Sequence, residues 1–301
     1  MTSIAPTQNS DQSAAQGMDR SFARPQTLMD LVWTGIAFTL LGIALLPLLL
    51  VLGYVIFKGI GRFNLDLFTQ QIPAALQPGG GVGSAIAGTL LTVAIATLIS
   101  VPLSILAAVY LSEFSSKNIA DWIRFATNAL SGVPSIIVGI FAYGMFVVTI
   151  GKFSALAGGV ALAILMLPLI VRSTDEALQL VPQDVRWASA VVGASQFQTV
   201  LQVILPAALP TILTGITLAI ARAAGETAPL IFTTLFSQFW PRGLFEPIPT
   251  LAVLIYNFAT VPFQNQQEIA WAASLLLVLL VLLSSLFARW ITRKSFYSQS
   301  Q

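Results

Sequence analysis

Cysteine and histidine are both absent from this 301-residue sequence, and charged residues make up only 9% of it. The two absences exclude disulfides, the usual structural zinc sites, iron–sulfur clusters, haem held by histidine or cysteine, and Ser-His or Cys-His nucleophiles. Soluble proteins carry about 25% charged residues, whereas 56% of this chain is hydrophobic. We therefore predict an integral membrane protein in which transport is favoured over catalysis. The net charge of +2 is too small to suggest a nucleic-acid partner.

Apolar runs long enough to cross a bilayer recur along the chain. A spanning helix needs about 20 mostly apolar residues, whereas barrel strands would alternate over segments of about 10 residues. The runs are continuous, so the predicted fold is an all-α membrane protein with six transmembrane helices in one lipid-embedded domain, 31–295. The predicted spans are 31–57, 84–112, 129–151, 153–172, 207–235 and 269–289.

One further apolar run, 251–261, is too short to span. Prolines at 247, 249 and 262 flank it. We predict a re-entrant or interfacial piece on the outer side of the membrane.

The ends of the chain and its Lys and Arg residues predict an orientation. The segment 1–30 is rich in Ser, Gln and Thr and is expected to be a disordered tail, with a second short tail at 296–301. No signal peptide is expected, because the first apolar run is too long and lacks a cleavage site. The positive-inside rule favours both termini in the cytoplasm of a multi-pass inner (plasma) membrane protein. The inner side would hold Arg20, Arg24, Lys117, Arg124, Arg172, Arg186, Arg289, Arg293 and Lys294, and the outer side Lys58, Arg62, Lys152 and Arg242.

The longest inner loop, 173–206, is patterned like structure rather than like a linker. Pro182 suits the start of a helix, Gly193 breaks it at a backbone angle that side chains disfavour, and a second helix begins near Ser195. Two short helices joined at a glycine would suit docking of a cytoplasmic partner, and an ordinary surface hairpin would show the same periodicity. The residues alone leave both interpretations open.

The spacing within this loop is similar to the EAA loop of bacterial ABC-importer permeases. The triplet position holds Trp187, Ala188 and Ser189, the glycine position Gly193, and the exit Val203, Leu205 and Pro206. The resemblance implies a coupling helix that inserts into a groove of an ATP-hydrolysing subunit. The family's leading Glu is Trp187 here, and its second Ala is Ser189. Asp184, three residues before the triplet, is the candidate for the missing charge.

Two further motifs resemble the phosphate-specific members of that group. They are ARAAGETAPL at 221–230 and SGVPSIIVG at 131–139, and the resemblance extends over about 31–294 and favours the A-type subunit. It implies the type I ABC-importer fold, alternating access, and one half of a phosphate path. It also implies a C-type partner subunit, two ATP-binding subunits and an extracytoplasmic phosphate-binding protein.

No GxxxxGK[ST] motif occurs, so this chain is not expected to hydrolyse ATP. We predict no catalytic residues, cofactor or metal on it, and assign ATP to a partner subunit.

Charges inside the predicted fifth span are the candidate substrate site. Arg222 and Glu226 are four residues apart, so they share a helix face and can pair. Arg222 would lie about 24 Å along the span at about 1.5 Å per residue, where a charge is costly and usually functional. A guanidinium binds phosphate in a bidentate way, with Glu226 holding it in place; a scaffolding ion pair is the other interpretation.

Arg172, at the predicted end of the fourth span, is either a positive-inside anchor or an aid to anion exit. Asp175 and Glu176 are expected on a solvated loop face or an ATPase interface. A permease for another oxyanion, molybdate or sulfate, and an ion channel are the rival functions.

Overall fold

The computed structural model describes the backbone of residues 25–297 and the side chains of residues 29–286. Most of the predicted tail 1–30 lies outside this range, as do part of the tail 296–301 and the side chains of Arg20, Arg24, Arg289, Arg293 and Lys294. The chain divides into two compact units, Met1–Tyr54 and Val55–Gln301.

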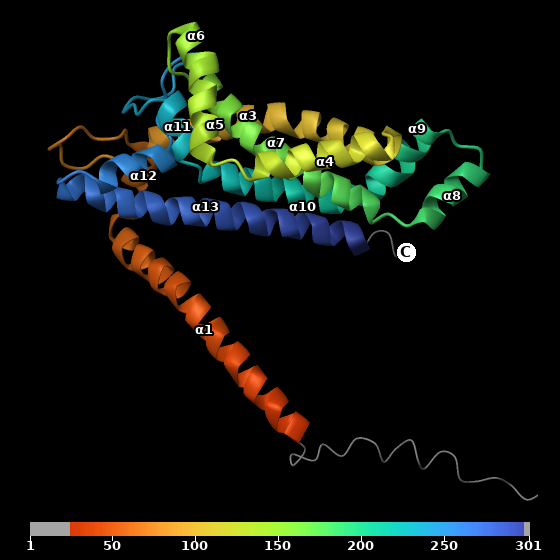
Figure 1. Cartoon of the computed structure of the whole chain (residues 1–301). Helices are drawn as coiled ribbons and strands as arrows, with labels where there is room; N and C mark the ends of the chain where they lie inside the picture. Colours follow the sequence, from red (N-terminus) through yellow and green to blue (C-terminus); the bar gives the residue numbers. More distant parts are fainter. Residues whose placement is uncertain (1–24, 298–301) are drawn as a thin grey trace, which may run out of the picture. The chain divides into compact units, whose positions relative to one another are not determined.

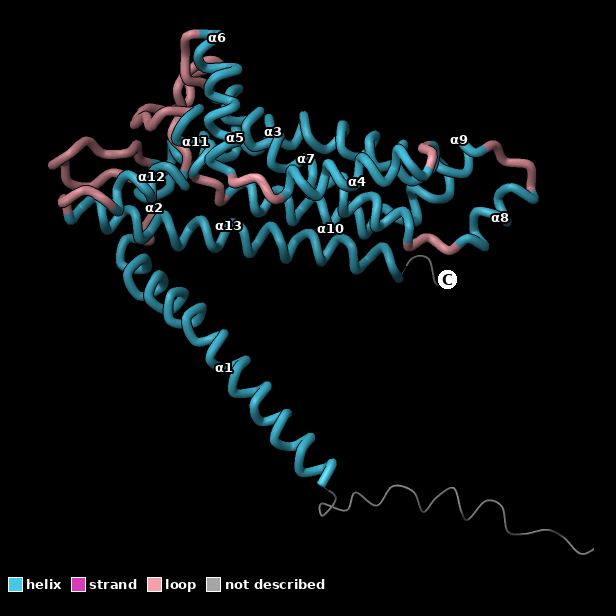
Figure 2. The backbone as a smooth tube through the Cα atoms, viewed as in Figure 1, coloured by secondary structure: helices cyan, strands magenta, loops and turns pink. Residues whose placement is uncertain are grey.

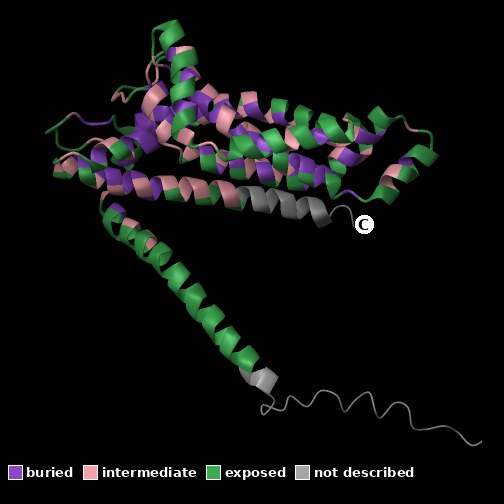
Figure 3. Ribbon diagram, in the orientation of Figure 1, coloured by how far each residue is buried: buried purple, intermediate pink, exposed green. Residues whose placement is uncertain are grey.

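The first unit contains most of helix α1 (Pro25–Gly59), which begins six residues before the predicted span. Leucine, isoleucine and valine recur all round this helix, and its described side chains are almost all exposed (Figure 3). A helix that is apolar on every side and exposed has the surface expected of a lipid-facing span.

The second unit is all-helical in its described residues, which confirms the predicted fold class (Figure 2). Its long helices are α3 (Gly83–Val109) with its π-helical end η3 (Tyr110–Phe114), α7 (Ala155–Gln179), α10 (Leu205–Ala224) and α13 (Gln264–Tyr297). Among the described residues, five helices are long and apolar enough to span, or six if one bent pair counts as a span. The short elements are η2 (Ile60–Arg62), α2 (Leu65–Thr69), α8 (Gln183–Val191), α9 (Gln196–Thr199), η5 (Val200–Ile204), α11 (Ala228–Thr233) and α12 (Leu251–Ala259).

The bent pair replaces the predicted straight span 129–151. It consists of α4 (Lys117–Ser131) and a second arm built from α5 (Ser135–Ala142), η4 (Tyr143–Val147) and α6 (Val148–Ile150). The helix axis bends by 95° between the two arms. Pro134 causes the break, because it disfavours helical backbone at the residue before it and cannot donate a hydrogen bond. The polar half, α4, was missed because its charged residues keep it out of a hydropathy search.

The predicted span 207–235 is also interrupted. The continuous helix formed by α9, η5 and α10 runs over Gln196–Ala224, and the chain then breaks before α11. Pro229 explains the break: within a longer helix its ring would clash with the carbonyl of Gly225 and leave it without its donor. At the start of α11 the same proline costs nothing.

Small residues let α3 and α7 approach closely. A Cβ added at Gly158 would lie 3.1 Å from Cγ2 of Thr92 on α3, and one added at Gly159 would lie 2.4 Å from Cγ2 of Ile95 on the same helix. The same cluster of buried residues continues through Ala219 of α10. Close contact at small residues is the way helices associate in a bilayer, and it fixes α7 between α3 and α10 (Figure 1).

The short apolar run predicted at 251–261 forms α12, which packs against α13 and α3. Leu251, Leu254 and Phe258 are fully or almost fully buried in it. One face of α12 is therefore surrounded by protein, and whether the segment is re-entrant or interfacial stays a prediction.

Candidate functional site

Arg222 and Glu226 lie where α10 ends. Arg222 is in the last turn of α10, where a cation is favoured by the helix dipole, and Glu226 lies in the break before α11. Their side chains pair at 3.4 Å between Nε and Oε1. The Arg222 side chain is 63% exposed and that of Glu226 17%. Both face a groove of about 800 Å³ whose other wall is mostly apolar and belongs to α13.

Arg172 pairs with Glu176 on α7 at 2.8 Å, and both side chains are 60% exposed. The predicted fourth span ended at 172, whereas α7 continues to Gln179. Arg172 is therefore inside a helix and not at its end. The helix continues because the polar residues after Arg172 are held by packing and pairing within the protein, which a hydropathy pattern does not register.

The two Arg–Glu pairs lie at successive levels of the bundle. α7 ends at the end of the bundle that carries α8 and α9, and the chain enters α10 from that same end. The two helices therefore run antiparallel (Figure 1). Ser173 of α7 lies beside Gly215 of α10, since a Cβ on Gly215 would come within 2.2 Å of the Ser173 hydroxyl oxygen. At about 1.5 Å per residue, Arg172 and Arg222 are about 9 Å apart along the bundle axis.

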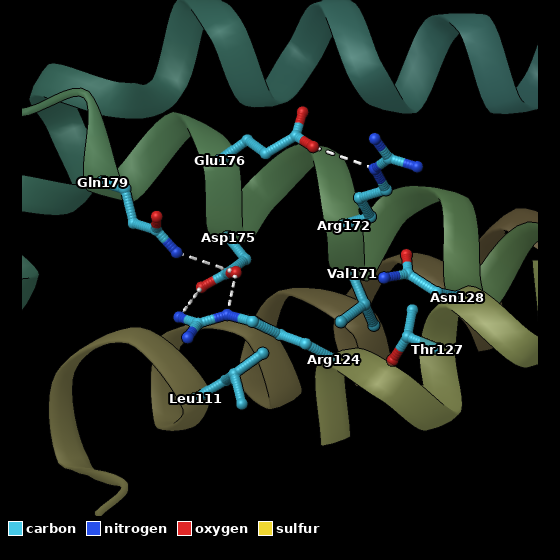
Figure 4. A pocket seen from close by; sticks show the side chains of 9 residues that line it. All are labelled: Leu111, Arg124, Thr127, Asn128, Val171, Arg172, Asp175, Glu176 and Gln179. Carbon is cyan, nitrogen blue, oxygen red and sulfur yellow. Dashed lines mark hydrogen bonds and ion pairs between the residues drawn. The ribbon is translucent and has the colours of Figure 1, made fainter. Parts of the chain in front are cut away.

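A second arginine, Arg124, lies next to Arg172. The sequence had predicted only that Arg124 is on the inner side of the membrane. Arg124 of α4 donates from Nε to Asp175 Oδ2 at 2.8 Å and from Nη2 to Oδ1 at 3.2 Å (Figure 4). The Asp175 side chain is only 7% exposed, so the expectation of a solvated loop face was wrong for this residue. Gln179 donates to the same carboxylate at 2.9 Å. No sequence signal pairs Arg124 with Asp175, because 51 residues separate them.

These residues line a cavity of about 240 Å³ between α4 and α7, together with Arg172, Glu176 and the polar side chains of Thr127 and Asn128. Each arginine there already has a carboxylate partner. An anion entering the cavity would therefore have to compete with these pairs. Within the described residues, no group of His, Cys, Asp or Glu side chains is arranged to hold a metal ion.

The predicted helix pair is present in the loop between α7 and α10. Pro182 caps α8, and Ser195 caps α9 in a capping box with Gln198. Gly193 lies between them with φ of +86°. The predicted helix start, glycine break and second start are all confirmed.

The faces of α8 differ sharply. Ser189 is buried and its hydroxyl lies 2.8 Å from that of Thr199 on α9. Trp187 and Val191, one turn apart, are 65% and 86% exposed. Asp184 and Ala188 are exposed as well, with Asp184 in the first turn where the dipole favours an acid.

The predicted exit of this loop is helical. Val203 lies in η5, and Leu205 and Pro206 begin α10, so the loop that ends at 206 in the prediction ends at Ser195 in the structure. Pro206 is tolerated because the wider π-helical turn of η5 precedes it. Leu205 packs against the buried cluster beside α7.

The two sequence motifs outside the loop meet in space. A Cβ added at Gly139 of α5 would lie 2.7 Å from Pro229 Cα and 3.4 Å from the Ala228 carbonyl oxygen. Segment 131–139 therefore packs on segment 221–230 at the break that carries Glu226.

Comparison with known proteins shows the family to which the chain belongs. Residues 100–297 match the family described as "Binding-protein-dependent transport system inner membrane component". The phosphate transport system permease protein PstA of Yersinia pestis is 44% identical over 238 residues, 79% of this chain and 81% of the relative. The chain belongs to the PstA family of transport permeases. The PstA protein of Haemophilus influenzae is 42% identical over 256 residues, 85% of this chain and 90% of its own length.

Solved structures show the same fold at lower identity. The inward-facing MetNI methionine ABC transporter matches with a TM-score of 0.56 and 23% identity, over 71% of this chain and 94% of the other. A bacterial ABC transporter that imports alginate matches with a TM-score of 0.51 and 18% identity, over 87% and 98%. As a PstA-family permease, the chain is an inner-membrane transport component, and ATP hydrolysis belongs to a partner subunit in ABC systems.

Proposed function

We propose that this chain is the A-type transmembrane subunit of an ATP-driven phosphate importer and that Arg222, Arg172 and Glu226 lie on the anion path. The other half of the path would come from a C-type permease subunit. One of two ATP-binding subunits would dock at α8 and α9 on the cytoplasmic side, and a phosphate-binding protein would deliver the anion at the opposite face. The names of the relatives support phosphate as the substrate.

The observation that carries the proposal is the pair of exposed arginines within the spanning bundle. An exposed guanidinium in a membrane helix is costly unless it meets water, a partner subunit or a ligand. Arg222 faces a groove whose far wall is apolar, which suits a surface completed by a second subunit. Arg172, about 9 Å further along the axis, offers the next guanidinium. Glu226 and Glu176 pair with these arginines when no anion is bound. Because the glutamates compete with phosphate for the arginines, phosphate is not trapped.

The α8 surface supports the docking role. Its exposed face carries Trp187 and Val191 in place of a charge. An exposed apolar pair one helical turn apart is a typical interface element. We infer that contact with the ATPase is mainly apolar and that Asp184 contributes a charge at its edge.

Phosphate uptake by the reconstituted complex tests the path. Arg222→Gln should abolish uptake, and the exchange Arg222→Glu with Glu226→Arg is the decisive variant. The exchange keeps an ion pair four residues apart and moves the positive charge by about 6 Å. A path residue predicts an assembled complex that hydrolyses ATP and carries little phosphate.

Normal transport by the exchanged protein would return the pair to a scaffolding role. Uptake of sulfate or molybdate in place of phosphate would favour the oxyanion rival. Conduction without an associated ATPase would favour a channel.

A further inference from the structure

We propose that Glu113 and Arg186 form a clamp that positions the α8–α9 loop on α3, so that movement of the loop is passed to the transmembrane helices. Arg186 and Gln196 act on transport only through Glu113 and the helices they hold, so they are positioning residues. The inference rests on the proposed docking of an ATPase at α8 and α9.

Glu113 is the one acidic residue of η3, and it is held from both helices of the loop. Arg186 of α8 donates from Nη1 to both of its carboxylate oxygens. Gln196, the first residue of α9, donates to its backbone carbonyl. The side chain of Glu113 is 8% exposed and that of Arg186 17%. One residue at the end of α3 therefore meets both sides of the glycine break.

The same arginine reaches a second spanning helix. Arg186 Nη2 donates to the Leu178 carbonyl oxygen at 2.8 Å, and that carbonyl belongs to the last turn of α7. The last turn of a helix leaves carbonyls without partners in the helix itself, so a guanidinium is well placed there. Arg186 thus ties α8 to the ends of α3 and α7 together.

Stability alone does not explain a buried pair of this kind. A buried ion pair gains little net free energy over apolar packing, because removing both charges from water offsets their attraction. Breaking it is costly, since one charge is then left buried without its partner. The pair therefore fixes one position of α8 strongly, and α8 presents its exposed face, with Trp187 and Val191, to a partner.

Direct transfer of movement predicts a specific defect. Glu113→Gln should leave the ATPase bound, because the exposed face of α8 is unchanged. It should raise the number of ATP molecules hydrolysed per phosphate imported about fivefold or more, in line with the loss of coupling free energies of 1–3 kcal/mol. The matched control is Glu268→Gln, which removes the Arg62–Glu268 pair (3.0 Å) from η2 and α13. Its ratio should be that of the unaltered complex.

A covalent replacement distinguishes position from charge. The natural chain has no cysteine, so Glu113→Cys with Arg186→Cys can be joined by a bifunctional thiol reagent of about the length of the two side chains. The joined complex should regain most of the coupling that the unjoined pair lacks. Hydrolysis without import in the joined complex would overturn the inference, as would an unchanged ratio in Glu113→Gln. If the unaltered chain does not bind an ATPase at all, the proposed function is wrong instead.

Discussion

Two glycines show two different physical reasons for lacking a side chain. Gly139 has ordinary backbone angles and almost no room, with Pro229 Cα 2.7 Å from the position of a Cβ. At Gly193, no atom lies within 4 Å of the position that a Cβ would take, and the backbone φ is +86°. The first glycine serves close packing, and the second serves a turn. Substitution by alanine should separate the two effects.

We expect Gly139→Ala to destabilise the protein by about 1–3 kcal/mol, because a methyl group would overpack the contact between α5 and α11. Gly144→Ala is the matched control on the same arm, since nothing lies within 4 Å of its Cβ position. Thermal unfolding in detergent measures both. Equal midpoints for the two variants would show that the close contact at Pro229 relaxes freely.

At Gly193 the cost is conformational. Alanine there should cost about 1–2 kcal/mol for a left-handed residue, weaken ATPase co-purification and lower uptake. Gly193→Val should be worse, because β-branching further restricts the backbone. Asparagine tolerates this backbone region better, so Gly193→Asn should recover much of the activity. If alanine and asparagine behave alike, the turn does not depend on the glycine angle.

At the scale of elements, the ion pair of Arg124 with Asp175 joins α4 to α7, beside the apolar contact of Ala120 and Val171. Removing the buried charge with Asp175→Asn should cost about 2 kcal/mol, the value of charge-assisted hydrogen bonds. Asp121→Asn removes an exposed carboxylate 3.6 Å from the same arginine and should change stability by about 0.5 kcal/mol or less. Detergent unfolding midpoints would show the difference. A larger effect from Asp121 would mean that the outer carboxylate anchors α4.

The sequence predicted elements better than it predicted their breaks and contacts. Hydropathy depends on composition along one segment, so it found the runs that became α1, α3, α7 and α13. It did not register Pro134 and Pro229 as breaks, because prolines also lie inside continuous helices of this chain, at Pro102, Pro168 and Pro210, and hydropathy does not distinguish the two cases. The helix–glycine–helix pattern of 182–195 was readable because caps and hinges are local. The pairs Arg124–Asp175 and Glu113–Arg186 were not, because only the fold brings those residues together.

At the scale of the whole molecule, the charged residues sort along the bundle. The Arg186–Glu113 and Arg124–Asp175 pairs lie toward the end of the bundle that carries α8 and α9. The Arg62–Glu268 pair lies at the other end of the bundle, where α13 begins. Arg222 and Glu226 lie between them, beside residues 277–286 of α13. The proposed anion path would run through the centre, between these ion pairs at the two ends. The path is directional only if the α8 end faces the cytoplasm.

Thiol labelling of intact cells tests that direction without background, because the natural chain has no cysteine. Ser116 and Leu65 lie beyond opposite ends of the continuous helix Gly83–Phe114, and both are exposed. An impermeant reagent added from outside should label Leu65→Cys and spare Ser116→Cys, since the positive-inside rule places the α4 start in the cytoplasm. Permeabilised cells should show labelling of both, which controls for reactivity. Labelling of Ser116→Cys alone in intact cells would reverse the orientation, place α8 and α9 outside the reach of ATP, and contradict the proposed docking of the ATPase there.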